Sequence, residues 1–448
     1  MTASGQAEAP GLGKAWFAVV LLVLLYCMSF IDRLVLSLLA SQVSASLHIS
    51  DTALGVLYGV GFGVVYSLIG LPLAHMIDNH NRVRLVIAGV VLWSACTLLS
   101  AFADTFMHLL LLRTGVAIGE AVLSPAAISL IADFFPRDKR TAPTTVYNAV
   151  SSYMGSGAFV IGAGALDIAT RYTAATGMEP WRFTLVLVGA PGLILALIFA
   201  LGVREPPRHQ EAAAAEQGKD FKSVGQALSY VRKEAGLYGC LFVCAAALTT
   251  IGFAASAWAP TLLVRAHGMT PAQSGYFYGT VGMIAAVCGA AVWPAAMRYW
   301  MKKGRLDALP TIMSVTVTIS WLAIATIGCA KADWIVLVAA GLNGFFGVAS
   351  GVLIPLIIQY VTPGRMRARI MALYLLANNL IGFAVGPPLA AFISENFYSG
   401  PFAIGYGFTT VALIFGPIGT IAVWRMRKYY ARALAEVQRT EAQAAGAA

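Results

Sequence analysis

Twelve long apolar runs, separated by turn or charged residues, follow one another along this chain of 448 residues. A helix needs roughly 20 apolar residues to cross the hydrocarbon core of a bilayer, and each run has about that length or more. The pattern predicts an all-α membrane protein and excludes a β-barrel, because barrel strands alternate polar and apolar residues. The predicted spans lie at about residues 15–45, 52–77, 82–102, 107–135, 141–169, 181–202, 237–265, 271–298, 308–329, 333–361, 366–395 and 402–424.

The composition agrees with a membrane protein. Hydrophobic residues make up 59% of the chain and charged residues 11%, whereas a soluble domain carries about 25% charged residues. The mean hydropathy of +0.76 excludes a soluble enzyme, a disordered scaffold and a secreted disulfide module. The six cysteines lie inside apolar runs without the spacing of a zinc site, so we expect packing roles for them and neither a metal nor a cofactor.

The net charge of +10 follows the topology of the chain rather than a nucleic-acid interface. If the N-terminus is cytoplasmic, 24 of the 30 lysines and arginines lie in or beside cytoplasmic segments. Membrane proteins carry such an excess of positive charge in their cytoplasmic loops, so the distribution predicts both termini in the cytoplasm. We therefore expect membrane lipids, and no nucleic acid, among the partners.

A charged segment with two prolines, residues 203–236, separates six runs from six runs. This plan is typical of transporters built from two pseudo-symmetric bundles, which bind their substrate between the halves near the midplane. The predicted domains are a cytoplasmic tail (1–14), a six-helix bundle (15–202), a cytoplasmic linker (203–236), a second six-helix bundle (237–430) and a second cytoplasmic tail (431–448).

Two local patterns, one in the linker and one in the spans, refine this plan. The apolar positions between Phe221 and Glu234 fit a helix on the membrane surface, although we favour a plain connector. Glycines recur every four residues in three of the runs, a spacing that lets helices approach closely. These glycines are Gly55, Gly59 and Gly63, Gly115 and Gly119, and Gly382 and Gly386.

The segment GLPLAHMIDNHNRVR, which ends at Arg84, follows the second run. It resembles the signature loop between the second and third helices of the major facilitator superfamily. Asp78, Arg82 and Arg84 match the acidic and basic positions of that loop, whereas Asn79 and Asn81 stand where a base and a glycine are usual. The resemblance implies a major facilitator fold of twelve transmembrane helices in two six-helix bundles.

Three further segments resemble the Spinster branch of that superfamily. They are YCMSFIDR (26–33), RTGVAIGEAVLSPAAISLIADFFPRDKR (113–140) and RMRARIMALYLLANNLIGFAVGPPL (365–389). Spinster-like proteins of animals export sphingosine-1-phosphate or lysophospholipids, and bacterial members are proton-coupled transporters. The resemblance thus implies a monomeric transporter in a bacterial inner membrane. The segment GSGAFVIGAGAL (155–166) lacks the proline that often marks the fifth helix of drug/proton antiporters.

Four charged residues, Asp32, Arg33, Arg113 and Glu120, fall inside predicted spans of the first half. A charge within the bilayer costs several kcal/mol unless it is paired or hydrated, so such residues indicate function. Arg113 and Glu120 share nearly one face of a helix, with Ser124 one turn beyond. Two salt bridges that only hold the bundle together are the alternative interpretation. We favour a functional network, because neutral polar residues could build a purely structural one.

The favoured mechanism starts from the neutrality of this cluster when all four groups are ionised. Protonation of one acid frees an arginine that can bind an anion, so a proton and an anionic substrate alternate in one network. Asp32 and Glu120 are the predicted proton-coupling residues, with Glu120 as the main carrier, and Arg113 is the predicted anion anchor. The predicted substrate-binding residues are Arg33, Arg113, Tyr26, Ser29, Ser124, Trp258, Asn343, Tyr374 and Asn378.

The spans of the second half carry no charge in their middles and offer neutral polar and aromatic side chains instead. A ligand between the bundles would meet charge on one side and neutral surface on the other. An amphipathic lipid with an anionic head fits such a cavity.

A separate group of charges lies at the predicted cytoplasmic face. Asp78, Arg82 and Asp133 come from the first half, and Arg365 and Arg369 open the eleventh span. We predict that they pair across the halves and gate the inner side of the transporter. Ordinary topogenic charge is the alternative.

The sequence thus predicts a proton-coupled secondary transporter that moves a lysophospholipid or a sphingosine-1-phosphate-like anion by alternating access. The alternative substrate class is that of a multidrug or organic-anion/proton exporter. A lipid-modifying enzyme is excluded because the spans contain no catalytic pair of histidine or cysteine residues. A membrane receptor that does not transport remains an alternative function.

Overall fold

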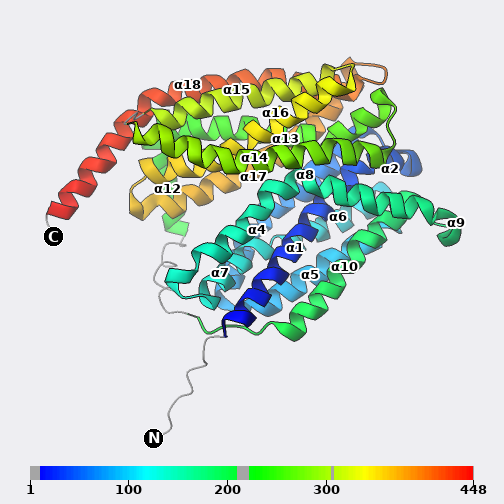
Figure 1. Cartoon of the computed structure of the whole chain (residues 1–448), viewed down its shortest axis with the longest axis horizontal. Helices are drawn as coiled ribbons and strands as arrows, with labels where there is room; N and C mark the ends of the chain where they lie inside the picture. Colours follow the sequence, from blue (N-terminus) through cyan, green and yellow to red (C-terminus); the bar gives the residue numbers. More distant parts are fainter. Residues whose placement is uncertain (1–10, 209–220, 304–306, 447–448) are drawn as a thin grey trace, which may run out of the picture. The chain divides into compact units, whose positions relative to one another are not determined.

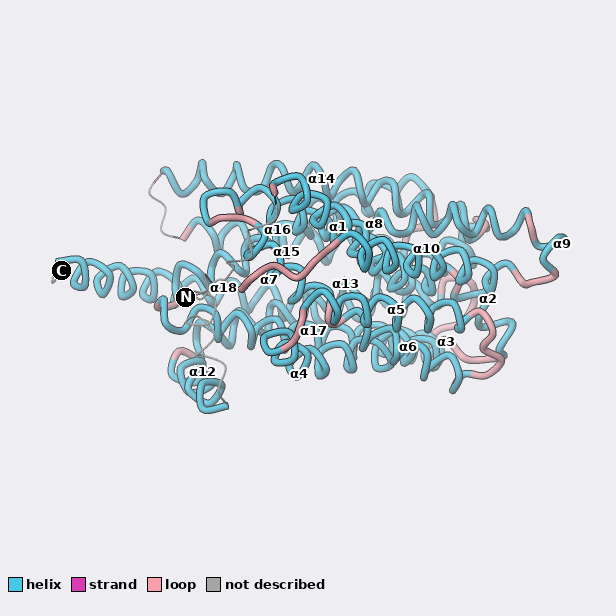
Figure 2. The backbone as a smooth tube through the Cα atoms, turned by 90° about the horizontal axis from the view of Figure 1, so that it is seen from below, coloured by secondary structure: helices cyan, strands magenta, loops and turns pink. Residues whose placement is uncertain are grey.

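The computed structural model of the protein describes residues 11–208, 221–303 and 307–446. These residues include twelve helical spans long and apolar enough to cross a membrane, and no strand. Figure 1 shows the helices in chain order, and Figure 2 shows that helix makes up nearly all of the described backbone. The predicted all-α membrane fold is confirmed.

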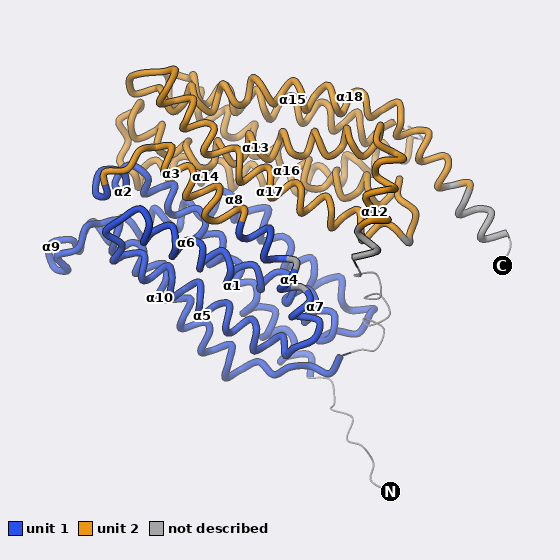
Figure 3. Tube along the Cα trace, turned by 180° about the vertical axis from the view of Figure 1, so that it is seen from behind, with its two compact units in different colours: residues 1–47, 65–217 blue, residues 48–64, 218–448 orange. Residues whose placement is uncertain are grey.

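The described chain divides into two compact units (Figure 3). The first unit comprises residues 1–47 and 65–217, and the second comprises residues 48–64 and 218–448. The described helices of the first unit are α1 (Leu12–Leu38), α2 (Ala40–Leu47), α4 (Val65–Asn79), α5 (Arg82–Ser100), α6 (Phe106–Glu120), α7 (Leu123–Phe134), η2 (Arg137–Lys139), α8 (Thr141–Arg171), α9 (Thr173–Thr176) and α10 (Pro180–Gly202). Those of the second unit are α3 (Asp51–Val56), η1 (Leu57–Val64), α12 (Phe221–Lys233), α13 (Ala235–His267), α14 (Pro271–Lys302), α15 (Ala308–Cys329), α16 (Asp333–Val361), α17 (Gly364–Phe397) and α18 (Ala403–Gly446).

Each unit has its own apolar core. In the first unit α1 packs on α8 and α5 packs on α6 and α10, and these helices bury Leu22, Trp93 and Phe199. In the second unit α18 packs on α13 and α15, and the core includes Met313 and Val423. Side chains on the outer faces of the helices stay apolar and exposed, which suits helices that meet lipid.

The second membrane span is divided between the two units. It consists of α3, the π-helix η1 and α4, and residues 48–64 cluster with the second unit. Gly55 and Gly59 lie against Pro388 of α17, and Gly63 lies against Phe383. A Cβ atom at any of the three would collide with that helix, so the predicted close packing at this glycine stripe is confirmed.

The fourth span is interrupted directly after Glu120, where α6 ends and α7 begins only at Leu123. Pro125 explains the interruption. It has no N–H to donate to the carbonyl of Ala121, four residues earlier, and its ring crowds that carbonyl. Broken helices in transporters often carry binding residues, because they bring irregular backbone to the middle of the membrane.

Two segments outside the predicted spans are helical. Residues 221–233 form α12 rather than the plain connector that we favoured, so that prediction was wrong. The helix α12 contacts α13 and α17. Its Tyr230 and Val231 pack against the core of the second unit, and the Tyr230 ring centroid lies 5.9 Å from that of Tyr238. Residues 209–220 of the predicted linker lie outside the described residues. The helix α18 continues through the described part of the range 431–448 that was expected to be a tail.

Candidate functional site

A buried ion pair joins α1 to the end of α6 in the first unit. Nη2 of Arg33 lies 3.0 Å from Oε2 of Glu120. The hydroxyl of Ser29, one turn before Arg33, donates to the same oxygen at 2.8 Å. The side chain of Glu120 has no exposed surface, and its Oε1 atom has no hydrogen-bond partner among the described residues. One carboxylate oxygen therefore carries both bonds, and the other is available to a proton.

The second arginine of the cluster, Arg113, holds the backbone of α1. Its Nη1 donates to the carbonyl of Asp32 at 3.0 Å and its Nη2 to the carbonyl of Arg33 at 3.5 Å. Asp32 and Arg113 are both buried. Arg113 thus fixes α1 against α6 and brings positive charge close to Asp32.

Aromatic rings surround the exposed side of the Arg33–Glu120 pair. The guanidinium of Arg33 lies 5.5 Å from the ring centroid of Phe30 and 5.1 Å from that of Tyr66. Tyr26 stacks on Tyr147 of α8 at 4.8 Å, with only 11° between the rings. The Arg33 side chain is 16% exposed while its partner is wholly buried. Arg33 is therefore the member of the pair that an approaching anion reaches first.

Ser124 closes this part of the site on α7. The hydroxyl of Tyr147 donates to the Ser124 hydroxyl at 3.4 Å. The first unit thus brings together the predicted residues Tyr26, Ser29, Arg33, Ser124 and Glu120, with Asp32 and Arg113 directly behind them.

Of the predicted residues of the second unit, Tyr374 and Asn378 lie one turn apart on α17, whereas Trp258 and Asn343 lie on α13 and α16. Trp258 of α13 is fully buried and donates from Nε1 to the carbonyl of Pro387 at 2.9 Å. Thr249 donates to Oδ1 of Asn378 at 2.5 Å. Tyr374 is buried on α17 beside Phe242, with 6.4 Å between the ring centroids. The hydrogen bonds of Trp258 and Asn378 thus join neutral groups only.

Asn343 differs from these residues because it lines a cavity of about 130 Å³. The cavity lies between α13, α15 and α16, and Ser320 donates to Oδ1 of Asn343 at 2.9 Å. Gly252 and Gly347 also line it, and their lack of side chains contributes to the space.

Three predicted gating residues belong to the first unit, and two of these bond to each other there. Arg82 forms a buried salt bridge with Asp133 and donates to the Ser129 hydroxyl at 2.9 Å. Its Nε also donates to Oε1 of Glu205 at 2.7 Å, and the second oxygen of Glu205 accepts from the N–H of Val83 at 2.9 Å. Arg82 therefore ties α5, α7 and the segment after α10 together inside one unit.

The remaining gating residues have separate surroundings. Asp78 is half-buried on α4. Arg369 of α17 donates to Oε1 of Gln226 on α12 at 2.9 Å. The side chain of Arg365 lies outside the described residues.

Several side chains in these clusters were not among the predicted site residues. Phe30 and Tyr66 flank Arg33, and Tyr147 reaches Ser124 from α8. Their spacing is that of ordinary buried aromatic residues, so the sequence carried no distinct signal for them. Glu205 did leave a signal, because it is an isolated acid between basic residues directly after a span.

A polar network that was also not predicted ties α3 to α13 and α17 within the second unit. Arg265 binds both carboxylate oxygens of Asp51, at 2.5 and 2.8 Å. Glu395 accepts from the N–H of Asp51 at 2.7 Å and from the hydroxyl of Thr52. Nearby, His267 lies 2.6 Å from Asp333. These bonds hold the start of the second span on the second unit.

Two carboxylates outside the spans have a lowered pKa. The pKa of Glu179 lies below its usual value because the hydroxyl of Ser46 donates to it, followed by bonds from Arg182 and Trp181. The pKa of Asp307 is lowered by the hydrogen bond from Arg427, 2.6 Å away, and by the hydroxyl of Thr311. Both carboxylates are therefore ionised at neutral pH.

Comparisons with known proteins agree with this architecture. Residues 22–317 match the Major Facilitator Superfamily. An MFS-type efflux pump of Mycolicibacterium smegmatis is 29% identical over 443 residues, which cover 97% of each chain. Protein spinster homolog 1 of Homo sapiens is 25% identical over 421 residues, which cover 87% of this chain and 75% of that protein.

A solved structure shares the fold. The crystal structure of a bacterial homolog to the human lysosomal transporter Spinster, in an inward-facing and unoccupied conformation, matches with a TM-score of 0.76 and 23% identity. The match covers 95% of this chain and 99% of that one. With twelve spans and a family match over more than half of its length, the chain belongs to the major facilitator superfamily, and it is an integral multi-pass membrane transporter similar to the Spinster branch.

Proposed function

We propose that the protein exchanges protons for an amphipathic lipid anion, such as a lysophospholipid or a sphingosine-1-phosphate-like molecule, by alternating access. The observation that carries the proposal is the pairing of a partly exposed arginine with a wholly buried carboxylate. The pair is neutral at rest, and only the arginine is in reach of an anion. The pair links the binding of the two ligands, because the proton competes with Arg33 for Glu120 and the anion competes with Glu120 for Arg33.

The coupling follows from the bonds of Glu120. Its Oε2 atom accepts from Arg33 and Ser29, and a proton on the carboxylate removes the charge that holds Arg33. The guanidinium then binds an anionic head group, for which its planar fork of donors is well suited. When the anion leaves, Arg33 returns to Glu120 and the proton is released. Glu120 is thus the proposed main proton carrier, and Asp32 its partner.

The geometry favours Arg33 over Arg113 as the anion anchor. Arg113 donates to two backbone carbonyls of α1 and is buried. Moving it toward a substrate would break both bonds. We therefore assign head-group binding to Arg33, and to Arg113 the task of holding α1 beside the acid.

The aromatic residues support an amphipathic substrate rather than a small inorganic anion. Tyr26, Phe30 and Tyr66 offer apolar surface next to the charged pair. Neutral groups of the second unit, Asn343 and Asn378 above all, remain proposed substrate contacts. Trp258 and Tyr374 are so deeply buried that we propose packing roles for them in the described state.

The proposal extends to the orientation and gating of the transporter. The distribution of basic residues supports cytoplasmic termini, and the similarity to a bacterial efflux pump supports a bacterial inner membrane. We propose that Asp78, Arg365 and Arg369 contribute to the inner gate. Arg82 and Asp133, which bond to each other, stiffen the first unit on that side.

Transport assays in proteoliposomes test the proposal directly. Lysophospholipids of increasing chain length are offered to the full-length protein with and without a pH gradient. We expect the gradient to drive flux, and affinity to rise with chain length by at most about 0.8 kcal/mol for each methylene buried. Affinity independent of chain length would reject the lipid substrate, and flux indifferent to the gradient would reject the proton coupling.

A multidrug or organic-anion/proton exporter is the second candidate. The similarity to the MFS-type efflux pump of Mycolicibacterium smegmatis, which spans nearly the whole chain, favours it. Both candidates use the same pair of Arg33 and Glu120. A competition binding assay distinguishes the two candidates. Structurally unrelated organic anions should displace a labelled lysolipid only from an exporter of broad specificity.

A further inference from the structure

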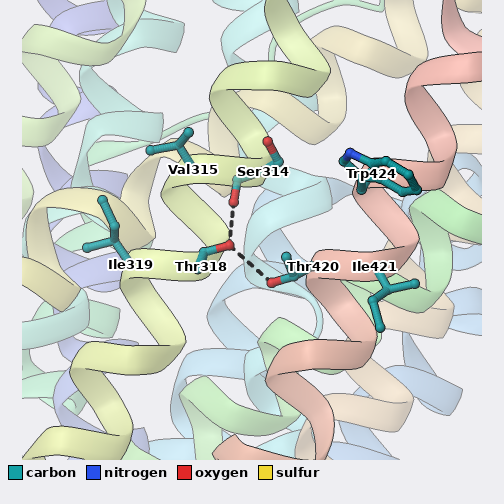
Figure 4. A pocket seen from close by; sticks show the side chains of 7 residues that line it. All are labelled: Ser314, Val315, Thr318, Ile319, Thr420, Ile421 and Trp424. Atoms are coloured by element: carbon teal, nitrogen blue, oxygen red, sulfur yellow. Dashed lines mark hydrogen bonds between the residues drawn. The ribbon is translucent and has the colours of Figure 1, made fainter.

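A groove of about 420 Å³ runs between α15 and α18 of the second unit (Figure 4). Its size lies within the roughly 300–1,000 Å³ that is common for ligand sites. Val315 of α15 and Ile421 and Trp424 of α18 line it and are 51%, 56% and 58% exposed. Such apolar exposure on a membrane-spanning pair of helices is a surface that meets lipid.

The polar groups in the groove are bonded to one another in a fixed direction. Thr318 donates its only proton to the carbonyl of Ser314 at 2.7 Å, so it must accept from Thr420, 3.2 Å away. Thr420 in turn accepts from the indole N–H of Trp321 at 3.1 Å. Figure 4 shows the bonds of Thr318 to Ser314 and to Thr420. Every hydroxyl proton is used, and what remains for an occupant is an apolar lining.

Positive charge stands at one end of the groove. Lys428 lies one turn beyond Trp424 on α18, with its Nζ 5.9 Å from the Trp424 ring centroid, and Arg425 lies one turn beyond Ile421. Both are exposed. The neighbouring Arg427 is neutralised by Asp307 at 2.6 Å, whereas neither Arg425 nor Lys428 forms a salt bridge with a described acid. An apolar groove that ends at a tryptophan and two cations is complementary to an acyl chain with an anionic head.

We propose that this groove binds an anionic glycerophospholipid of the surrounding bilayer. One acyl chain lies over Val315, Thr318 and Ile421, and the phosphate rests on Lys428 and Arg425. The lipid is a resident of the second unit and not the transported substrate, whose proposed site is the charge cluster of the first unit.

Native mass spectrometry of the full-length protein tests the head-group contact. The protein is equilibrated with equal amounts of phosphatidylglycerol and phosphatidylcholine before detergent is removed. We expect the wild type to retain phosphatidylglycerol in preference, and the preference to fall by about fivefold for each charge removed in Arg425→Gln and Lys428→Gln. The matched control, Arg84→Gln with Lys139→Gln, removes two exposed charges from the first unit and should keep the preference.

The groove itself is tested by filling it and by fluorescence quenching. Val315→Trp should lower retention of both lipids without changing their ratio. Phosphatidylglycerol with brominated acyl chains should quench part of the tryptophan emission of the wild type. This part of the quenching should be lost in Trp424→Phe. Equal retention of the two lipids by the wild type, equal loss in the control, or unchanged quenching in Trp424→Phe would overturn the proposal.

Discussion

The two units differ in the polar groups that they place inside the membrane spans. The first unit places two acids and two arginines in the interior of its spans, with Glu120 and Arg33 as an ion pair. In the interior of the second unit the described spans form hydrogen bonds between neutral groups, such as Trp258 to a carbonyl and Ser320 to Asn343. Of these two arrangements, only the first contains carboxylates that can take up a proton. On the proposed mechanism, proton sensitivity therefore belongs to the first unit, and the second provides neutral surroundings.

Glu120→Gln should produce the largest effect, because it removes the wholly buried acid that pairs with the partly exposed Arg33. The amide retains an acceptor for Ser29 but cannot gain or lose a proton. Proton-driven flux in proteoliposomes should fall by about 100-fold, the lower range for loss of a positioned proton-transfer group, while binding stays measurable.

The control for this variant is Asp138→Asn, which removes an exposed acid of the same unit. It should leave coupling unchanged. Retention of full proton-driven flux by Glu120→Gln would remove the proposed difference between the units.

Asn378→Asp tests the same comparison from the opposite side, since it places a carboxylate where the second unit has an amide. Thr249 can still donate to it, but no described arginine pairs with this position. We expect a loss of about 2 kcal/mol in unfolding free energy at neutral pH, less than the full cost of an unpaired buried charge because the site is half-buried. Thermal unfolding at pH 7 and pH 5 measures it, and acid should restore stability because the protonated side chain matches the amide.

Asn396→Asp is the matched control on the same helix, because Asn396 is exposed. It should cost less than 0.5 kcal/mol, in the ordinary range for surface changes. If both variants behaved alike, the second unit would tolerate charge as well as the first.

Trp258→Phe should have a smaller effect, because it deletes one neutral hydrogen bond and leaves the carbonyl of Pro387 without its donor. A loss of about 1 kcal/mol in unfolding free energy is expected, with the response to a pH gradient unchanged. Trp334→Phe, at a position that is 66% exposed, provides the control. An altered proton response in Trp258→Phe would show that the second unit takes part in coupling.

The smallest effect concerns acids outside the spans, where the two units should not differ. Glu179 and Asp307 both have a lowered pKa, through Ser46 and Arg427 respectively. Their contribution to stability is therefore present above the ordinary values of 4.5 and 3.8 and is lost as the pH falls through the lowered values. Because both side chains are largely solvated, each contributes at most about 0.5 kcal/mol.

Unfolding temperatures recorded between pH 6 and pH 3 measure these contributions. Glu179→Gln and Asp307→Asn should flatten the profile slightly and to a similar extent. A much larger change in one variant would mean that the units also differ at their surfaces.

The periodicity of the sequence was sufficient for the spans and for the glycine contacts, but not for the pairing of charges. Arg113 and Glu120 share nearly one helical face, but that spacing does not say which arginine pairs with which acid. In the structure Glu120 pairs with Arg33 of α1, and Arg113 donates to two backbone carbonyls of the same helix. Which residue of one helix meets which residue of another depends on the rotation of both helices, and spacing within one helix does not contain it.

The segment around Glu205 shows a second limit. Its prolines and charges indicated a linker, and that composition is indeed polar. The contacts of Glu205 with Arg82 and Val83 nevertheless tie the first residues of this segment to the start of α5. Arg82 is buried, and a buried guanidinium needs an acid to balance its charge. Its burial is a property of the folded bundle and cannot be seen in the local sequence.

The division of the second span has a consequence for attempts to split the transporter into two polypeptides. Residues 48–64 are encoded in the N-terminal half but cluster with the second unit, against Phe383 and Pro388. A fragment ending in the polar segment near residue 217 would expose that glycine-rich face to lipid without its partner. Expressed alone, each fragment should be prone to degradation, and the two should be recovered intact only when they are produced together.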